Sequence, residues 1–337
     1  MDQIDADRPD LEEKTRFLRS PESYPEGTAS VRPVETHMAR VFLTDRHAYK
    51  MKKPVRTRYL DFSSLDKRYG VCREELRLNR RLTDGVYLDV VPLRLTADAH
   101  LNLGEQGTPV EWLVKMRRLP QGDCLAERIG ALSTAGLQPL LDRLRTFYRQ
   151  AEVIPLTANQ YLQRLRRHTE RCRDDLLLPE LQQDGGEIRA LAASLLNFTR
   201  RHSALLGERA ESGLIVEGHG DLRPEHCFLT EPPQVIDCLE FNRDLRWVDP
   251  LDELSYLALE CELLGREDLA EAIVRSGPGA PPDSLSPFYK ASRAFLRARL
   301  AATHLLDGPR YRENGEVDKW LRKTRTYLDA ARRHCPR

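Results

Sequence analysis

The strongest chemical signal in this sequence is the stretch His219-Gly220-Asp221-Leu222-Arg223-Pro224-Glu225-His226. Phosphoryl transfer needs a carboxylate that orients the attacking hydroxyl and accepts its proton, together with ligands for the metal ion that accompanies the phosphates. Asp221 fits the first role, and Asp237, at the end of the short apolar stretch Val235-Ile236, fits the second. The segment between the two aspartates is short and β-like, so one hairpin could bring both carboxylates to one site. The ordered pair therefore predicts a phosphotransferase.

A site of this kind also needs a lysine on a strand that can reach the phosphates. In Ala48-Tyr49-Lys50-Met51-Lys52, strand alternation places both lysines on the same face, so alternation alone does not choose between them. Lys50 lies within the predicted strand, whereas Lys52 leads directly into Lys53-Pro54, where strand pairing stops. We therefore predict Lys50 as the phosphate lysine and keep Lys52 as the alternative.

The lysine needs a glutamate partner on the helix that follows it. Glu75 lies beside the apolar stripe of that helix, together with Asn79, whereas Glu74 points to the opposite side. The stripe has helical spacing and consists of Leu65, Tyr69, Cys72 and Leu76. Glu75 is therefore the glutamate predicted to pair with Lys50.

A β-rich first part of the chain precedes a helical second part. After a short helix at 10–18, strands are predicted over 31–35, 40–44, 48–52, 86–95 and 109–116, with one prominent helix from Ser63-Ser64 to about Leu82. Helical periodicity then dominates, over 136–151, 159–178, 187–206, 251–264, 287–306 and 316–334. The sequence predicts an α+β protein with a nucleotide-binding N-lobe over residues 1–118 and a helical C-lobe over 119–337 that carries the catalytic loop and the acceptor site.

The bulk composition is that of a globular protein with little overall charge. Of 337 residues, 40% are hydrophobic and 31% are charged, and the formal net charge is +1. This charge offers no general attraction for nucleic acid or an acidic membrane, and no run of about 20 apolar residues predicts a membrane span. The seven cysteines contain no Cys-x-x-Cys pair, and residues 1–13 are unlike a signal peptide. We expect a cytoplasmic protein, whose oligomeric state the sequence does not reveal.

Several stretches resemble the aminoglycoside-phosphotransferase-like branch of the kinase-like fold, in particular its bacterial members of undefined substrate. The likeness extends over about residues 17–306. Before the catalytic loop it includes Ser20-Pro21-Glu22-Ser23-Tyr24-Pro25, Glu35-Thr36-His37, Ala48-Tyr49-Lys50-Met51-Lys52-Lys53-Pro54-Val55 and Glu75-Leu76-Arg77-Leu78-Asn79. After that loop it includes Asp237-Cys238-Leu239-Glu240-Phe241-Asn242, Leu245-Arg246-Trp247-Val248-Asp249 and Pro287-Phe288-Tyr289-Lys290.

The resemblance implies a bilobal, protein-kinase-like fold that binds ATP or GTP between its lobes, with Mg²⁺ or Mn²⁺ on the phosphates. Asp221 would be the catalytic base, Arg223 would contact the γ-phosphate, and Asp237 and His226 would bind the metal. His226 stands where the family loop normally has Asn, which replaces an oxygen ligand by a nitrogen. The branch is often fused to a C-terminal ATPase domain with a Walker motif, which we expect to be absent because Gly-x-x-x-x-Gly-Lys-Ser/Thr does not occur.

The remaining nucleotide contacts would come from the N-lobe, from Lys50 and Glu75, from Thr36 and His37 in the first hairpin, and from Met116. Thr36-His37 stands where other kinases place a glycine-rich loop, and the resembling branch also lacks that loop. Met116 is either strand core or a wall of the nucleotide pocket, and the sequence does not distinguish the two.

Three functions remain open from the sequence. The first is a kinase that phosphorylates a hydroxyl of a small molecule, and the second is a nucleotide-binding pseudokinase with a regulatory or partner-binding role, suggested by His226. The third is a protein kinase, which the short distance from Asp237 to the helix near Leu251 disfavours because little room is left for an activation segment. The acceptor is not readable, although the basic residues of one late helix fit an anionic acceptor at least as well as an aminoglycoside: Lys290, Arg293, Arg297 and Arg299.

Overall fold

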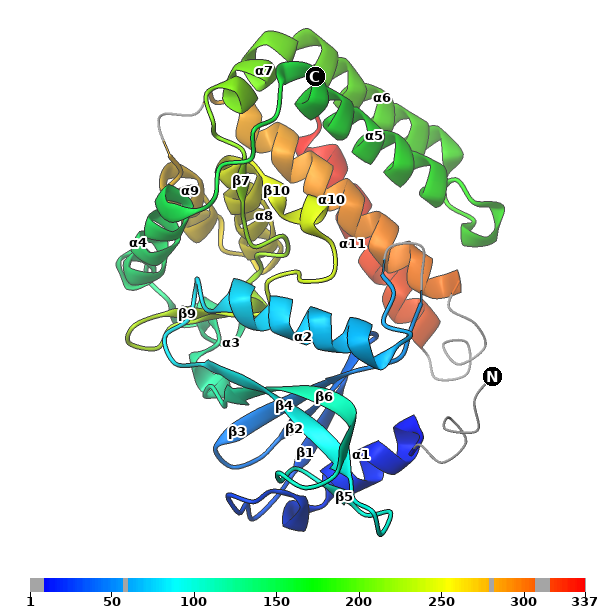
Figure 1. Ribbon diagram of the computed structural model, residues 1–337. Helices are drawn as coiled ribbons and strands as arrows, with labels where there is room; N and C mark the ends of the chain where they lie inside the picture. Colours follow the sequence, from blue (N-terminus) through cyan, green and yellow to red (C-terminus); the bar gives the residue numbers. More distant parts are fainter. Residues whose placement is uncertain (1–8, 57–59, 279–281, 307–315, 337) are drawn as a thin grey trace. The chain divides into compact units, whose positions relative to one another are not determined.

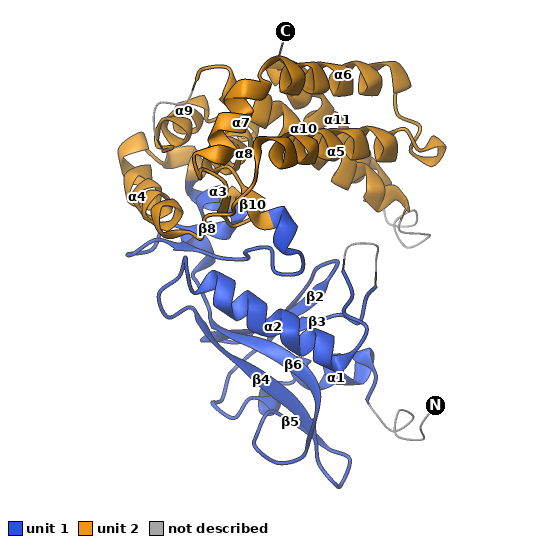
Figure 2. Ribbon diagram, turned by 45° about the horizontal axis from the view of Figure 1, so that its top comes forward, with its two compact units in different colours: residues 1–128, 225–245 blue, residues 129–224, 246–337 orange. Residues whose placement is uncertain are grey.

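The computed structural model describes residues 9–56, 60–278, 282–306 and 316–336. The chain forms two compact units, of which the first contains residues 1–128 and 225–245 and the second contains 129–224 and 246–337 (Figure 2). The lobe boundary after residue 118 stays a prediction. The first unit combines a β-sheet with few helices and the second is mainly helical, so the predicted α+β class is confirmed (Figure 1).

Unit 1 is built on a six-stranded antiparallel sheet with the order β1-β2-β3-β6-β4-β5. The strands are β1 (Arg32–Glu35), β2 (Ala39–Leu43), β3 (His47–Lys52), β4 (Tyr87–Leu95), β5 (Leu101–Asn102) and β6 (Thr108–Arg117). A tight turn joins β2 to β3, because the Thr44 amide donates to the His47 carbonyl at 2.9 Å and the His47 amide donates to the Thr44 hydroxyl at 2.9 Å. The five longer strands were predicted with bounds within two residues of those observed.

The two faces of this sheet carry different helices. Helix α2 (Leu65–Asn79), whose N-cap Ser64 accepts a hydrogen bond from the Lys67 amide, packs on the face that contains Ala48 and Val114. Helix α1 (Leu11–Arg19), begun by a capping box of Asp10 and Glu13, contributes Leu18 to the core on the other face. Because side chains alternate along β3, Tyr49 and Met51 point to the α1 side while Lys50 and Lys52 point to the α2 side.

A second chain segment completes unit 1. It begins with a 3₁₀ turn (Pro224–His226) and continues as a hairpin of β8 (Cys227–Phe228) and β9 (Gln234–Val235). The Val235 amide donates to the Leu82 carbonyl at 3.1 Å, which joins the hairpin to the residues just after α2. Further short elements in this unit are 3₁₀ turns at Pro21–Ser23, Gln121–Asp123 and Arg243–Arg246, and α3 (Leu125–Arg128).

Unit 2 packs its helices around α8 and α10, the two most deeply buried ones (Figure 1). Asp249 caps α8 by accepting from the Leu251 amide at 2.9 Å, and its carboxylate also receives Arg209 and the Tyr289 hydroxyl. These contacts fix where α8 begins. The helices are α4 (Thr134–Gln150), α5 (Ala158–Leu176), α6 (Gly185–Arg201), α7 (Ser203–Glu211), α8 (Pro250–Leu263), α9 (Glu267–Arg275), α10 (Leu285–Thr303) and α11 (Glu316–His334), with a short pair of β7 (Val216–Glu217) and β10 (Trp247–Val248).

Two helical predictions differ from the structure. The single helix predicted over 187–206 is divided at His202, whose ring stacks on Phe198 and whose backbone leaves the helical region. Helix α9 was not predicted, because it is short and directly follows Gly265, whose φ of +77° ends the preceding helical turn. Among the helices of the described residues, none is both long and apolar enough to cross a membrane.

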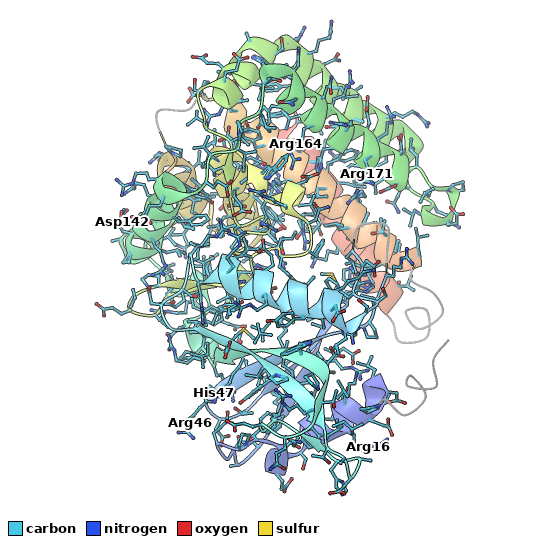
Figure 3. All side chains as sticks on the ribbon, viewed as in Figure 1. Arg16, Arg46, His47, Asp142, Arg164 and Arg171 are labelled. Carbon is cyan, nitrogen blue, oxygen red and sulfur yellow. The ribbon has the colours of Figure 1, made fainter. Side chains whose placement is uncertain are left out.

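A half-buried carboxylate on the α1 side of unit 1, Glu26, should make the fold sensitive to acid. Glu26 receives the Tyr49 hydroxyl and the Lys115 ammonium (Nζ–Oε1 3.1 Å), and His47, labelled in Figure 3, also lies against it. Partial desolvation opposes the charge of Glu26, but the hydrogen bonds from Tyr49 and Lys115 hold its pKa at about 2, below the ordinary 4.5. Because the folded-state pKa is the lower one, this contribution to stability is present above about pH 4.5 and is lost as the pH falls towards 2.

We expect Glu26→Gln to reduce the free energy of unfolding at pH 7 by about 1–3 kcal/mol, because a charged hydrogen-bond acceptor is lost. The difference between parent and variant should shrink between pH 4.5 and pH 2, as the parent carboxylate becomes protonated. Urea unfolding followed by circular dichroism at several pH values measures both effects. A difference that stays constant over this range would show that Glu26 does not supply the acid dependence.

Candidate active site

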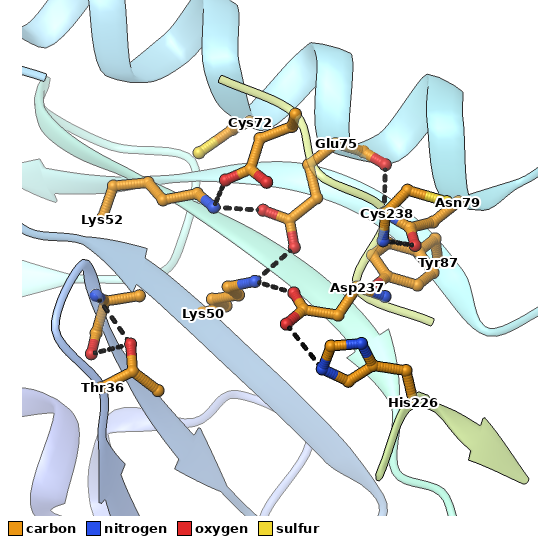
Figure 4. A network of polar contacts seen from close by, with 12 residues as sticks. Thr36, Lys50, Lys52, Cys72, Glu75, Asn79, Tyr87, His226, Asp237 and Cys238 are labelled. Atoms are coloured by element: carbon orange, nitrogen blue, oxygen red, sulfur yellow. Dashed lines mark hydrogen bonds and ion pairs between the residues drawn. The ribbon is translucent and has the colours of Figure 1, made fainter. Parts of the chain in front are cut away.

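Three charged side chains from separate parts of unit 1 meet at the α2 face of the sheet. The Lys50 ammonium on β3 lies 2.8 Å from Oε1 of Glu75 on α2 and 2.5 Å from Oδ1 of Asp237, which follows β9 (Figure 4). Glu75 is fully buried, whereas the Asp237 side chain is 43% exposed. The structure thus brings together the lysine, glutamate and aspartate that the sequence singled out, with the aspartate open to a ligand.

The second lysine of β3 takes part in the same cluster. Lys52 Nζ lies 2.5 Å from Oε2 of Glu75, and it also contacts the Glu240 carboxylate. Glu75 therefore divides its two oxygens between two lysines. Lys50 is the one in contact with Asp237, and its side chain is 13% exposed against 1% for Lys52. Both facts favour Lys50 as the residue that would reach a phosphate.

The ion pairs determine the charge states in this cluster. Desolvation opposes the charge of Lys50, but Asp237 and Glu75 raise its pKa well above the ordinary value. Desolvation likewise opposes ionisation of Glu75 and Asp237, but Lys50 lowers the pKa of both carboxyls, with Lys52 acting further on Glu75 and His226 on Asp237. All three groups are therefore charged at neutral pH.

The backbone at Asp237 is held in an unusual conformation. Its φ is +64°, in the left-handed region that non-glycine residues rarely adopt. The Asp237 amide donates to the Tyr87 hydroxyl at 3.2 Å, and the Cys238 amide donates to Oδ1 of Asn79 at 2.9 Å. Asn79 in turn donates to the Glu75 carbonyl at 2.8 Å (Figure 4). Strain of this kind persists only where the surroundings fix it, which is typical of functional sites.

His226 lies beside Asp237 because the β8–β9 hairpin brings their backbones together. The Ile236 amide donates to the His226 carbonyl at 2.9 Å, and Nε2 of His226 lies 3.5 Å from Oδ2 of Asp237. Among the described residues, no group of three His, Cys, Asp or Glu side chains could hold a metal ion. Asp237 and His226 place one carboxylate oxygen and one imidazole nitrogen side by side at this point of the site.

Asp221 and Arg223 lie together in unit 2. Arg223 Nε donates to Oδ2 of Asp221 at 3.1 Å, and the Tyr256 hydroxyl of α8 donates to Oδ1 at 3.0 Å. Both carboxylate oxygens are thus oriented by a donor. The Asp221 amide donates to Nδ1 of His219 at 3.2 Å, so the His219 side chain helps to fix the shape of this loop.

A buried glutamate of α8 fixes the backbone of this loop. Glu253 accepts from the His219 amide at 2.9 Å, from the Gly220 amide at 2.6 Å and from the Tyr148 hydroxyl at 2.9 Å. A Cβ on Gly218 would come within 2.4 Å of Val248 and 2.8 Å of the Glu253 carboxylate, so glycine is required at this position. Sequence reasoning missed Glu253 and Tyr256, since both belong to a helix that otherwise reads as apolar core.

The other predicted nucleotide residues of unit 1 lie elsewhere on the sheet. Thr36 and His37 form the exposed turn between β1 and β2, where the Thr36 hydroxyl accepts from the Ala39 amide at 3.0 Å. Met116 on β6 is buried opposite Ala48, in the apolar cluster that Ile236 also joins. Met116 is therefore part of the core of unit 1.

The basic residues of α10 each face a carboxylate within unit 2. The pairs are Lys290 with Glu262 (2.5 Å), Arg293 with Asp252 (2.7 Å), Arg297 with Glu260 (3.7 Å) and Arg299 with Asp175 (3.2 Å). Nearer the start of α5, the Arg164 guanidinium lies over the Trp247 ring. Because the α10 cations are neutralised by these partners, the argument for an anionic acceptor loses its basis.

This chain has sequence relatives among known proteins. No protein-family model matches the chain. An uncharacterised protein of Mycobacterium tuberculosis (strain H37Rv) is 31% identical over an alignment of 316 positions that covers 84% of this chain and 59% of that protein, and one of Mycobacterium bovis matches equally well. The chain thus spans 59% of the length of these relatives.

Solved structures similar to this chain include phosphotransferases. The complex of the aminoglycoside phosphotransferase APH(2″)-IIIa with GDP and kanamycin has a TM-score of 0.58 at 15% identity, covering 96% of this chain and 99% of that one. A putative aminoglycoside phosphotransferase from Ralstonia eutropha has a TM-score of 0.51 at 14% identity, covering 96% and 98%. A choline kinase from Streptococcus pneumoniae has a TM-score of 0.50 at 13% identity, covering 90% and 94%. The chain has the α+β, kinase-like fold of the aminoglycoside phosphotransferase family.

Proposed function

We propose that this protein is a phosphotransferase that moves the γ-phosphoryl group of ATP or GTP to a hydroxyl of a small molecule. The observation that carries the proposal is the contact of Lys50 with both Glu75 and the partly exposed Asp237. Phosphoryl transfer depends on positioning and on positive charge at the phosphates, and a lysine held by a buried glutamate provides both. The fold supports the same reaction class, because the similar solved structures include aminoglycoside phosphotransferases and a choline kinase.

In the proposed reaction, Lys50 binds phosphate oxygens while Glu75 holds its ammonium in place. Asp221 accepts the proton of the acceptor hydroxyl, whose oxygen forms the new bond to phosphorus as the bond to the β-phosphate oxygen breaks. The Tyr256 and Arg223 donors keep the Asp221 carboxylate oriented for this step, and Arg223 adds positive charge for the transferred group. When Mg²⁺ is bound, it neutralises phosphate charge, and Asp237 with His226 are the residues that would hold it.

Nucleotide binding is the direct test of this proposal. With ATP or GTP at about 100 times the dissociation constant, binding should stabilise the fold by about 2.7 kcal/mol and raise its melting temperature. Differential scanning fluorimetry with ATP, GTP and a pyrimidine nucleotide, each with Mg²⁺ or Mn²⁺, measures the effect. If millimolar purine nucleotide leaves the melting temperature unchanged with both metals, the proposed function is wrong.

A nucleotide-binding pseudokinase is the second candidate, and His226 is the observation that favours it. The imidazole lies where an oxygen ligand is usual and faces Oδ2 of Asp237. A protein of this kind would bind nucleotide and change its interaction with a partner without turnover. Turnover with any metal and acceptor separates the two candidates.

The residue at position 226 should set the metal preference of an active enzyme. Imidazole nitrogen suits Mn²⁺ better than Mg²⁺, which prefers oxygen ligands. We therefore expect higher turnover with Mn²⁺ than with Mg²⁺, and a shift of the preference towards Mg²⁺ in His226→Asn. Turnover in metal titrations of parent and variant measures both. An unchanged preference in His226→Asn would mean that the imidazole supports Asp237 without binding the ion.

A further inference from the structure

The pair formed by Lys52 and Glu240 has no role in the proposed chemistry, although it is joined to the active cluster. Lys52 Nζ contacts Oε2 of Glu75 and the Glu240 carboxylate, and the Lys52 side chain is almost fully buried. Five charged groups form one sequence of contacts with alternating sign: Glu240, Lys52, Glu75, Lys50 and Asp237. Figure 4 shows the last four of them.

Glu240 belongs to the same short segment as Asp237, Asp237-Cys238-Leu239-Glu240. One end of this segment is fastened to β3 by the contact of Asp237 with Lys50, and the other end by the contact of Glu240 with Lys52. Between them, the Cys238 amide is bound to Asn79 of α2. The Lys52–Glu240 pair is thus a second attachment of the metal-binding segment to the sheet.

The first attachment would change in the proposed reaction. With a metal–nucleotide bound, Lys50 would bind phosphate oxygens and Asp237 would hold the ion, so their mutual contact, now 2.5 Å, would be weakened. Asp237 must then keep its position, with φ at +64°, with less support from that ion pair. The Lys52–Glu240 contact would not need to change, because neither side chain is assigned to the nucleotide or the metal and both are largely buried from solvent.

Lys52 also fixes how Glu75 meets Lys50. A carboxylate can accept from one ammonium with both of its oxygens, but here Oε2 is taken by Lys52 and Oε1 alone faces Lys50. Because only one Glu75 oxygen contacts Lys50, the Lys50 ammonium has further N–H groups that can donate to a phosphate. Lys52 therefore orients both the glutamate and the metal-binding segment.

We propose that Lys52 and Glu240 are positioning residues that hold Asp237 and Glu75 in place once Lys50 has turned to the nucleotide. This inference rests on the proposed function. If the inference is right, removing the pair weakens nucleotide binding more strongly in the presence of metal than in its absence. A pair that only stabilises the fold would change the free energy of unfolding without changing the effect of the metal.

The test compares nucleotide affinity with and without metal. Calorimetric dissociation constants for ADP and GDP, measured in Mg²⁺ and again in EDTA, give the metal-dependent gain in affinity. In Glu240→Gln we expect this gain to fall about 10-fold or more, because the support of a metal ligand is lost, while affinity in EDTA changes by less than about twofold. Glu111→Gln is the matched control, since Glu111 is also buried in unit 1 and is paired with Arg68 and Lys14.

A double variant guards against a failure to fold. Lys52→Met combined with Glu240→Gln removes one ammonium and one carboxylate together, so the net charge of the buried cluster is unchanged. We expect a melting temperature close to that of the parent and a metal-dependent gain that is still reduced. If both variants show the same metal-dependent gain in nucleotide affinity as the parent, or if Glu111→Gln loses as much of this gain as they do, the inference about Lys52 and Glu240 is wrong. The proposed function is not affected by either result. A parent that binds neither ADP nor GDP would overturn the proposed function together with the inference.

Discussion

Asp221→Asn should lower the rate of phosphoryl transfer by about 10²–10⁴-fold, the usual contribution of a general base. The amide keeps the size of the carboxylate but cannot accept the proton of the acceptor hydroxyl. Nucleotide affinity should change by less than about twofold, because in the proposed reaction Asp221 acts on the acceptor hydroxyl, whereas Lys50 binds the phosphates and Asp237 would hold the metal. The rate at saturating nucleotide and the dissociation constant, measured on the same preparation, separate the two effects.

Asp142→Asn is the control for this experiment. Asp142 is an exposed carboxylate of α4 in the same unit, bound to Arg145 at 2.6 Å (Figure 3). It should retain parental turnover. Equal turnover in Asp221→Asn and the parent would exclude Asp221 as the base.

Asp237→Ala should act on binding. Removing the carboxylate takes away the predicted anchor of the metal, so the affinity for nucleotide in Mg²⁺ or Mn²⁺ should fall by at least about 10-fold. Affinity in EDTA should change much less, since Lys50 keeps its pairing with Glu75. Calorimetric titrations with each metal and with EDTA measure the difference.

Asp244→Ala is the corresponding control, because Asp244 is exposed and lies farther along the same chain segment. It should leave both affinities unchanged. If Asp237→Ala loses affinity equally with metal and with EDTA, then Asp237 supports the pocket without anchoring an ion.

The sequence alone predicts the direction of those side chains that the local periodicity of a strand or helix determines. Alternation along β3 placed Lys50 and Lys52 on one face, and helical spacing placed Glu75 on the side of α2 that meets that face. The short strand before Asp237 predicted where that carboxylate would emerge. In each case the pattern of a single element fixes the direction of the side chain.

Local patterns do not reveal partners that meet only through tertiary packing. Glu240, Tyr87 and Asn79 reach the cluster from three different elements, and none lies near Lys50 in the sequence. Strand alternation alone also could not show that the Glu75 carboxylate would form ion pairs with both Lys50 and Lys52. Whether Glu75 can reach both lysines depends on the position of α2 along β3. The packing of apolar side chains between the helix and the sheet sets that position.

Helix α8 shows a second kind of limit. It is apolar around most of its circumference, which is typical of a helix buried on all sides. Glu253 and Tyr256 then look like ordinary interruptions of a core pattern. Only the folded chain shows that both face the loop that carries Asp221.

Nucleotide turnover tests the central claim most directly. The parent, Asp221→Asn and Asp142→Asn are compared for release of ADP or GDP from ATP or GTP, with Mg²⁺ or Mn²⁺ and a panel of neutral, cationic and anionic alcohols. We predict that at least one alcohol stimulates turnover by the parent and by Asp142→Asn, that it becomes phosphorylated, and that Asp221→Asn loses this activity. A parent that binds nucleotide but shows no turnover with either metal and any alcohol, or an Asp221→Asn that turns over as fast as the parent, would contradict the account.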